Sequence, residues 1–154
     1  MKHFVLFLPL LILLTGCSAS KSGSGDLKLQ VVTQQADAWV NLMPGSTHSF
    51  YISATINIRN EEDAPIDSLQ LLKCEARQDG KTIYLLHPVL KKTSEIHNPL
   101  NPDSEGIFTI NLPVGTPVLN ELDLEKPVSI YIYLSAFNKI KIHEIDDIKV
   151  VKAY

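Results

Sequence analysis

The chain has 154 residues, with 14 lysines and arginines against 17 aspartates and glutamates, so its formal net charge is −3. This mild acidity, with no basic cluster in the sequence, argues against nucleic acid and anionic lipid as partners. The length suits one compact domain with a sizeable core and leaves little room for a second domain.

The first residues have the pattern of a secretory signal. Residues 1–3 include a lysine, and residues 4–14 are apolar except for Pro9. That run is shorter than the ~20 apolar residues of a membrane-spanning helix, but it suits a signal peptide. It ends in Leu14-Thr15-Gly16-Cys17. This motif closely resembles the lipobox of bacterial lipoproteins, where a small residue precedes the cysteine that receives the lipid.

The resemblance implies three segments. Residues 1–16 are removed, residues 17–25 are a lipidated Cys17 followed by a Ser/Gly linker, and residues 26–154 form the folded domain. Lipoproteins carry two or three acyl chains, and two or more chains hold a protein stably on a membrane. In Gram-negative lipoproteins Ser18, in place of Asp, favours the outer membrane. The linker behaves as a coil with a reach of about 15 Å.

Residues 26–154 show the period-two alternation of β-strands. The two clearest segments are residues 49–60, with Phe50, Ile52, Ala54, Ile56 and Ile58 on one face, and residues 127–137, with Val128, Ile130, Ile132, Leu134 and Ala136 on one face. The other expected strands are residues 27–32, 36–42, 69–77, 82–86, 106–112 and 139–151. Asp79-Gly80 marks a hairpin turn. Residues 91–106 and 113–123 are expected loops, and a short helical turn over residues 119–124 is the alternative for the second.

Seven or eight short strands without a long helix predict an all-β fold, an antiparallel immunoglobulin-like β-sandwich. A small barrel is the alternative.

Within residues 69–77, Leu72, Cys74 and Ala76 are expected on one inward face. Cys17 is used by lipid, so Cys74 has no partner within the chain. We expect Cys74 to be buried and inert, with a covalent link to another protein as the alternative.

Two groups of side chains are candidates for protein binding. Trp39, the only tryptophan, precedes a turn and is followed by Leu42 and Met43. These three residues form either an exposed apolar contact at a loop tip or, for Trp39, part of the core. Tyr131 and Tyr133 alternate with the expected core face of their strand, so they are expected on its outer face unless inside and outside are reversed.

Metal sites have weak support. The histidines are widely separated, and only Met43 with His48 suggests part of a soft copper site. The acidic loops lack the Asp-x-Asp-x-Asp-Gly pattern of a calcium loop. No cofactor is expected.

The sequence carries no catalytic motif such as Gly-x-Ser-x-Gly or His-Glu-x-x-His. We therefore expect a non-enzymatic, lipid-anchored module that binds another protein of the bacterial envelope. Two alternatives stay open. One is a small-ligand or copper carrier, and the other is an inhibitor of an envelope hydrolase that presents a loop such as residues 42–47 or 91–106.

Overall fold

The computed structural model describes residues 26–93 and 99–154. The expected signal peptide, Cys17 and the linker lie outside these described residues, and what was expected of them stays a prediction. Within the described ranges, no helix has the length and apolar character that a membrane span requires. The ten strands are β1 (Leu29–Asn41), β2 (Ser49–Asn60), β3 (Gln70–Gln78), β4 (Lys81–Leu86), β5 (Val89–Lys92), β6 (Glu105–Asn111), β7 (Thr116–Pro117), β8 (Val128–Ala136), β9 (Lys139–Ile148) and β10 (Val150–Ala153).

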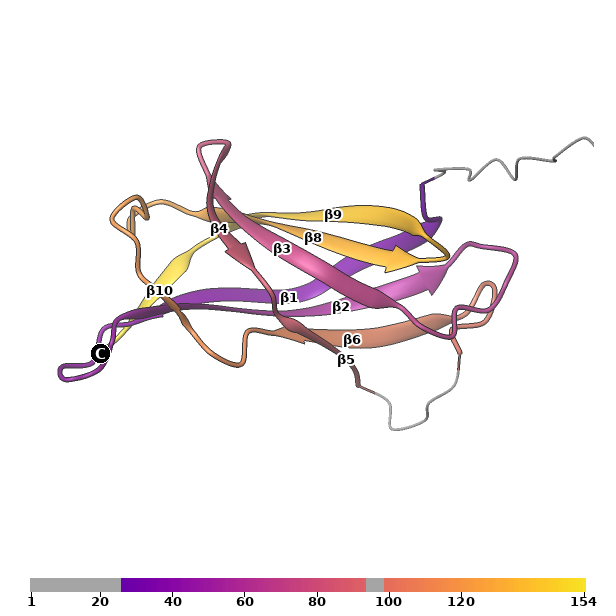
Figure 1. Ribbon diagram of the computed structural model, residues 1–154, viewed down its shortest axis with the longest axis horizontal. Helices are drawn as coiled ribbons and strands as arrows, with labels where there is room; N and C mark the ends of the chain where they lie inside the picture. Colours follow the sequence, from indigo (N-terminus) through magenta and orange to yellow (C-terminus); the bar gives the residue numbers. More distant parts are fainter. Residues whose placement is uncertain (1–25, 94–98) are drawn as a thin grey trace, which may run out of the picture.

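These strands form the two layers of a β-sandwich (Figure 1), which confirms the all-β expectation. The first sheet has six strands in the order β10-β1-β2-β6-β5, with β7 paired to β2. The second sheet has four strands in the order β4-β3-β8-β9. Neighbouring strands are antiparallel except β1 and β10, which are parallel.

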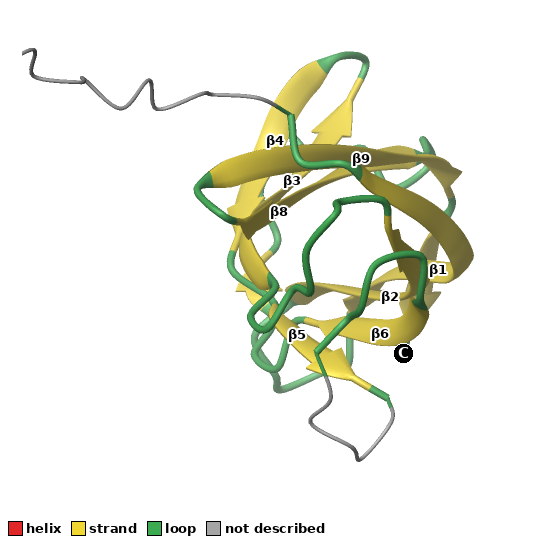
Figure 2. Cartoon of the chain, turned by 90° about the vertical axis from the view of Figure 1, so that its right-hand side faces the viewer, coloured by secondary structure: helices red, strands yellow, loops and turns green. Residues whose placement is uncertain are grey.

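Edge strands cross from one sheet to the other on both sides of the sandwich. β4 passes into β5 through His87 and Pro88, and β9 passes into β10 through Lys149 alone. Asp147, just before the second crossing, has a φ of 58°, a left-handed conformation that aspartate tolerates better than most residues. Seen end-on, the strands therefore surround the core almost as a closed ring (Figure 2).

The core lies between the sheets and follows the alternation of the two clearest strands. All five apolar residues expected on the inner face of β2, and all five expected on that of β8, are buried. The Asp79-Gly80 turn between β3 and β4 is also confirmed, with φ angles of 49° and 75°. Each buried aliphatic side chain of this kind contributes ~1.5–3 kcal/mol, so these two strands account for much of the core.

Several expectations about β1 and β3 are corrected. The two strands expected at residues 27–32 and 36–42 are one strand, β1, with a register shift between Thr33 and Gln35. In β3, Cys74 and Ala76 are buried, but Leu72 is exposed because a register shift between Leu71 and Lys73 turns it outward. A β-bulge of this kind breaks the period-two rule at one residue.

The loop expected at residues 91–106 includes the end of β5 and the start of β6. The loop expected at residues 113–123 includes the whole of β7, and it holds turns rather than a helical segment. With β10, the short strands β5 and β7 raise the number above the seven or eight expected.

The β9 strand turns its basic residues inward. Lys139, Lys141 and His143 pair with buried residues of β8, whereas Ile140 and Ile142 lie on the outer face. His143 Nε2 lies 2.8 Å from Thr33 Oγ1 of β1, and burial lowers the pKa of this histidine. Charged residues that point inward along an edge strand discourage unwanted pairing with other chains.

The chain enters the domain through contacts with both sheets. The Leu27 amide donates to the Ile140 carbonyl in β9 at 3.2 Å, and the Lys28 amide donates to Glu62 Oε1 at 3.0 Å. Lys139 Nζ donates to both Glu62 oxygens at 2.9 Å. The Lys28 amide first, and then Lys139, lower the pKa of Glu62. Residues 27–29 are thereby fixed to β9 and to the loop after β2.

Candidate functional site

The candidate binding residues lie in two separate places. Trp39 is on the outer face of the first sheet, with Leu42 and Met43 just beyond the end of β1. Tyr131 and Tyr133 are on the outer face of β8 in the second sheet, as expected. The structure therefore does not bring the five residues together, since the core lies between the two outer faces.

Trp39 belongs neither to the core nor to a loop tip. It is half-buried between the inward residues Ala38 and Val40, and its ring stacks on Tyr51 of β2 with centroids 5.3 Å apart and planes at 6°. A Cβ added to Gly115 would lie 2.4 Å from the Tyr51 ring, so the backbone of Gly115 approaches that ring closely. The Trp39–Tyr51 stack is therefore a cross-strand pair that stabilises the first sheet.

The end of β1 offers little apolar surface. Leu42 packs partly against the core, and its amide donates to the Ala153 carbonyl at 2.7 Å. Met43 is exposed, and its amide donates to Asn41 Oδ1 at 3.0 Å within the turn. Of the three residues that were expected to form a contact at this tip, Met43 alone remains as an exposed apolar side chain, which makes the second sheet the stronger candidate.

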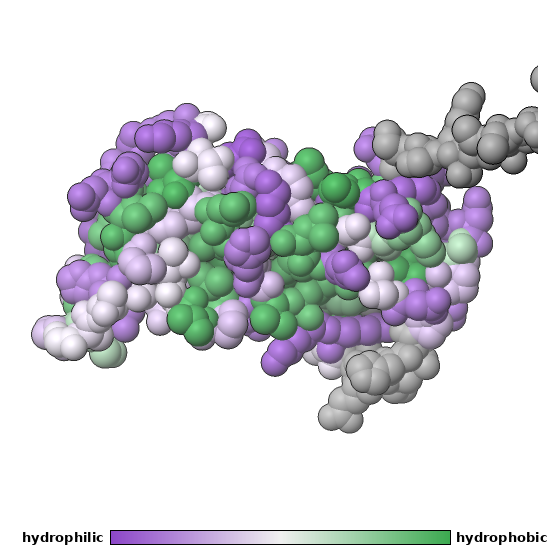
Figure 3. Space-filling model, viewed as in Figure 1, coloured by the Kyte–Doolittle hydropathy of each residue, from purple (hydrophilic) through white to green (hydrophobic). Residues whose placement is uncertain are grey.

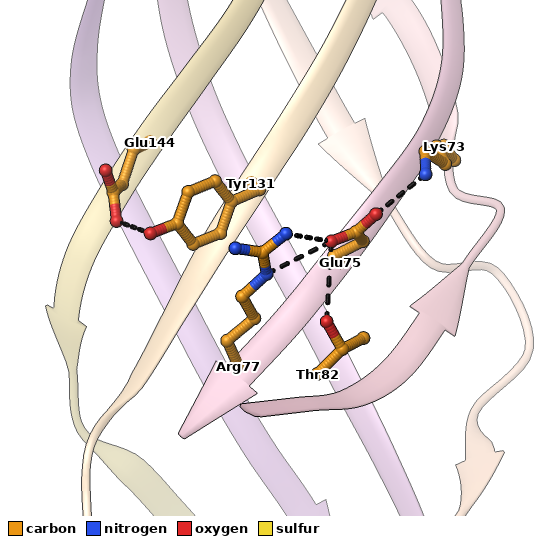
Figure 4. Close-up of polar contacts among 6 residues, drawn as sticks. All are labelled: Lys73, Glu75, Arg77, Thr82, Tyr131 and Glu144. Carbon is orange, nitrogen blue, oxygen red and sulfur yellow. Dashed lines mark hydrogen bonds and ion pairs between the residues drawn. The ribbon is translucent and has the colours of Figure 1, made fainter. Parts of the chain in front are cut away.

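Both tyrosines of β8 are covered by cations from β3. Figure 4 shows Arg77 beside the ring of Tyr131. Lys73 Nζ lies 4.3 Å from the centre of the Tyr133 ring, and the guanidinium carbon of Arg77 lies 4.1 Å from the centre of the Tyr131 ring. The Tyr131 hydroxyl donates to Glu144 of β9, and this bond raises the pKa of the tyrosine. Such cation–π contacts fix the ring orientations and contribute ~0.5–1 kcal/mol each at exposed sites.

Glu75 of β3 holds the two cations in place. Lys73 Nζ donates to Glu75 Oε1 at 2.7 Å, and Arg77 donates to Oε2 through Nε at 3.0 Å and through Nη2. Glu75 is only 8% exposed. The hydrogen bonds from Lys73 and then from Arg77 lower its pKa to about 2, so the carboxylate is charged at neutral pH. The β3 charges and the β8 rings thus form one ordered network.

Sequence reasoning missed Lys73, Glu75 and Arg77. The signal was present, because these charges alternate with the inward residues Cys74 and Ala76 along one strand. Opposite charges two residues apart on a strand lie on one face and within reach of the neighbouring strand. What the sequence lacked was the register that sets Lys73 against Tyr133 and Glu75 against Tyr131.

Exposed apolar side chains surround this network. Leu85 of β4 is 56% exposed opposite Glu75, Ile142 of β9 is 52% exposed opposite Tyr133, and Ile140 is 46% exposed opposite Ser135. A shallow hollow of about 450 Å³ lies at the edge near Tyr133, Ile140 and Ile142. We call the whole surface the tyrosine face: Lys73, Glu75, Arg77, Leu85, Tyr131, Tyr133, Ile140, Ile142 and Glu144.

The tyrosine face combines paired charges, aromatic rings and exposed apolar side chains. Its lysine and arginine are paired with Glu75, and the hydroxyl of Tyr131 is paired with Glu144. Elsewhere among residues 26–93 and 99–154, no group of three or more His, Cys, Asp or Glu side chains is placed to hold a metal ion. Met43 and His48 are both exposed in the loop after β1.

Cys74 of β3 is completely buried, as expected. Its side chain faces the core, and burial raises the pKa of the thiol to about 12. A thiol of this kind is rarely in the reactive thiolate form. The covalent link considered from the sequence would therefore require the domain to open.

Comparison with known proteins identified no relative of this chain. No protein family, no curated protein and no solved structure matches this chain.

Proposed function

We propose that this chain is a non-enzymatic binding module of the bacterial envelope, held to a membrane by lipid on Cys17, that docks another envelope protein through the tyrosine face. The observation that carries the proposal is the ordered Tyr131 and Tyr133 pair among exposed isoleucines and a leucine. Tyrosine and arginine are enriched at the centres of protein interfaces, where they supply much of the binding energy.

Preorganisation favours this surface over the other exposed parts of the domain. Side chains that are free before binding lose about 0.5–1.5 kcal/mol each when a partner immobilises them. Arg77 and Lys73 are already held by Glu75, and Tyr131 is held by Glu144. The partner therefore meets a surface that has already lost most of its side-chain freedom.

The size of the face agrees with a modest interface that the anchor assists. Four strands at ~4.8 Å spacing and nine residues at ~3.3 Å give about 600 Å². A standard interface covers ~800 Å² on each partner. Confinement to one membrane raises the effective concentration of two anchored proteins, so a smaller interface suffices.

The position of the chain entry suggests where the partner lies. Asp26, the first described residue, lines the same hollow as Tyr133 and Ile142. A linker of residues 17–25 would then leave the domain beside the tyrosine face and place that face within about 15 Å of the anchor. This favours a partner that is itself at the membrane surface.

The test is crosslinking in living cells with a matched pair of variants. The full-length chain carries a C-terminal tag, and crosslinked partners are identified after solubilisation in mild detergent. Ile142→Asp places a charge on the tyrosine face, and Ile107→Asp places one at another exposed isoleucine, on the outer face of the first sheet. We expect Ile142→Asp to abolish capture of one reproducible partner and Ile107→Asp to retain it. Equal capture by both variants, or no reproducible partner, would overturn the proposal.

A further inference from the structure

The outer face of the first sheet is poor in charge. Its middle is formed by residues 35–41 of β1, 49–57 of β2 and 107–111 of β6, and these three segments hold one charged residue, Asp37. Charged side chains normally favour solvent-exposed positions. Here the outward positions carry amides and hydroxyls instead, and none of these side chains is fully buried: Gln35, Ser53, Thr55, Asn57, Thr109 and Asn111. Solubility alone does not require this choice, so the face calls for a second explanation.

An aromatic pair lies at one end of this face. Trp39 and Tyr51 stack with planes at 6° and ring centroids 5.3 Å apart. Parallel rings in contact are separated by ~3.5–4 Å, so these two rings are shifted sideways by about 3.5–4 Å and overlap only in part. Both side chains are half-buried, and Val151, the neighbour of Trp39 on β10, is itself 57% exposed. Part of the aromatic surface is therefore open to a ligand.

A row of polar groups crosses the sheet directly beside the aromatic pair. Asp37, Ser53 and Asn111 lie opposite one another on three neighbouring strands, about 7 Å along the strands from the two rings. Ser53 Oγ donates to Asn111 Oδ1 at 2.9 Å, and Gln35 Nε2 donates to Asp37 Oδ2 at 2.8 Å. Among the described residues, the side-chain nitrogen of Asn111 and Oδ1 of Asp37 have no hydrogen-bond partner. One donor and one acceptor are thus available to a ligand that covers the rings.

These groups match the chemistry of a neutral sugar chain. Hydroxyls and amides both donate and accept hydrogen bonds, as the hydroxyls of a sugar do. The C–H groups of a sugar ring carry a slight positive charge and pack against the negative face of an aromatic ring. An anionic chain would need cations, and residues 35–41, 49–57 and 107–111 hold none. A protein partner would need a more apolar centre, such as the tyrosine face or the side of the molecule shown in Figure 3, where apolar residues cross the middle.

The dimensions of the face indicate a chain rather than a single sugar. Residues 51–57 extend for about 20 Å along β2, at ~3.3 Å for each residue. The three neighbouring strands β1, β2 and β6, at ~4.8 Å spacing, make the face about 10 Å wide. A long, narrow area of this kind holds several sugar units in a row, and each unit adds contacts.

From these observations we infer that the outer face of the first sheet binds a neutral, extended polysaccharide, with one sugar ring on Trp39 and Tyr51 and the following units on the hydroxyls and amides of β1, β2 and β6. The inference goes beyond the proposed function and does not rest on it, because the core separates this face from the tyrosine face. Both faces can be occupied at once, so one domain can hold a protein and a glycan together.

Titration with two defined sugars tests the inference on the full-length chain, kept in solution by a detergent that has no sugar headgroup. The probes are cellohexaose and hexa-N-acetylchitohexaose, which are neutral, extended and β-1,4-linked. Trp39 is the only tryptophan of the chain, so its fluorescence reports directly on this face. We expect at least one probe to change this fluorescence to saturation, and calorimetry to give the same dissociation constant. If neither probe binds, the inference is overturned.

Matched variants locate the bound sugar. Ser53→Ala combined with Asn111→Ala removes a hydroxyl and an amide from the face, and this change should weaken binding by about tenfold or more. Ser135→Ala is the control, because it removes a hydroxyl from the outer face of β8 in the second sheet and should leave binding unchanged. Urea unfolding shows whether both proteins are folded. Binding that survives the double change, or that Ser135→Ala weakens equally, would overturn the inference.

A charged probe needs no change in the protein. A β-1,4-linked hexamer of glucuronic acid has the same backbone as cellohexaose and adds a carboxylate to each unit. Because Asp37 repels these carboxylates and the middle of the face holds no cation, this hexamer should bind at least about tenfold more weakly than cellohexaose. Equal or tighter binding of the charged hexamer would overturn the assignment to a neutral sugar.

The tyrosine face provides the last control. Ile142→Asp lies on β9 in the second sheet, so this variant should bind the sugar as the wild type does. Loss of sugar binding in Ile142→Asp would place the sugar on the tyrosine face and overturn the inference. The failure of sugar binding would leave the proposed function standing, because that function is tested separately by the capture of a partner in cells.

Discussion

Replacing Glu75 by glutamine tests whether the network beneath the tyrosine face is held by one charge. The substitution keeps the shape of the side chain and removes the carboxylate that Lys73 and Arg77 share. Lowering the pKa of Glu75 from 4.5 to about 2 corresponds to at most about 3–4 kcal/mol, at ~1.4 kcal/mol for each pKa unit. The side chains of Lys73 and Arg77 are 35% and 30% exposed, so solvent screens part of this energy. We expect Glu75→Gln to lower the free energy of unfolding by about 1–2 kcal/mol at pH 7.

The pH dependence makes this prediction more specific. Because the pKa of Glu75 is lower in the folded state, its stabilisation is complete above pH 4.5 and is lost as the pH falls toward about 2. Urea unfolding, followed by the fluorescence of the only tryptophan, measures both proteins between pH 7 and pH 2. The difference between wild type and Glu75→Gln should close over that lower range. Asp103→Asn is the matched control, since Asp103 pairs with Arg59 at the surface and its side chain is 82% exposed.

Two results would refute the reasoning about Glu75. One is a change smaller than about 0.5 kcal/mol at pH 7, the size expected for an ordinary surface pair such as that of Asp103. The other is a difference between wild type and variant that stays constant from pH 7 to pH 2. Either result would mean that Lys73 and Arg77 keep their places over the tyrosine rings without the carboxylate.

Three further predictions concern other parts of the domain. Because burial lowers the pKa of His143, NMR titration should give this histidine a pKa below 6.5. The free energy of unfolding should fall as the pH drops below 6.5, because the unfolded chain takes up the proton first. A pKa at or above 6.5 would contradict the buried contact with Thr33. Burial raises the pKa of the Cys74 thiol to about 12, so this thiol should react with thiol reagents only as fast as the domain opens. Urea should therefore accelerate labelling. Rapid labelling of the native protein would contradict the burial of Cys74. Trp39→Ala should lower the free energy of unfolding by about 1–2 kcal/mol through loss of the stack on Tyr51. Circular dichroism in urea measures this change. An unchanged free energy of unfolding would mean that the stack contributes nothing.

The sequence predicted the layers of the fold well wherever one strand face is buried along its whole length. β2 and β8 lie near the middle of their sheets, so nothing interrupts their alternation and every inward residue was assigned correctly. The sequence did not predict side-chain orientation where tertiary structure changes the alternation of inward and outward residues along a strand. Leu72 points outward because β3 bulges opposite β8. β9 is an edge strand whose alternation places Ile140 and Ile142 on the exposed face and basic residues inside, an assignment that the period alone does not give.

The candidate site was predicted only in part, because its defining contacts join separate strands. Alternation placed Tyr131 and Tyr133 on an outer face, and the structure agrees. It did not place Glu75 between two cations, because the pairing of β3 with β8 is not visible in either strand alone. Trp39 was expected at a loop tip or in the core, yet it stands on the outer face of a strand that is longer than the sequence indicated.

The contacts around residues 27–29 also have a mechanical consequence. A load that reaches the domain through residue 26 would act on β1 if that strand were held by its sheet alone, and its hydrogen bonds would open one after another. Instead, Leu27 is bonded to β9, and Lys28 is bonded to Glu62, which Lys139 of β9 holds in turn. The load is therefore divided between both sheets at its point of entry, and several bonds must break together before β1 can be pulled away.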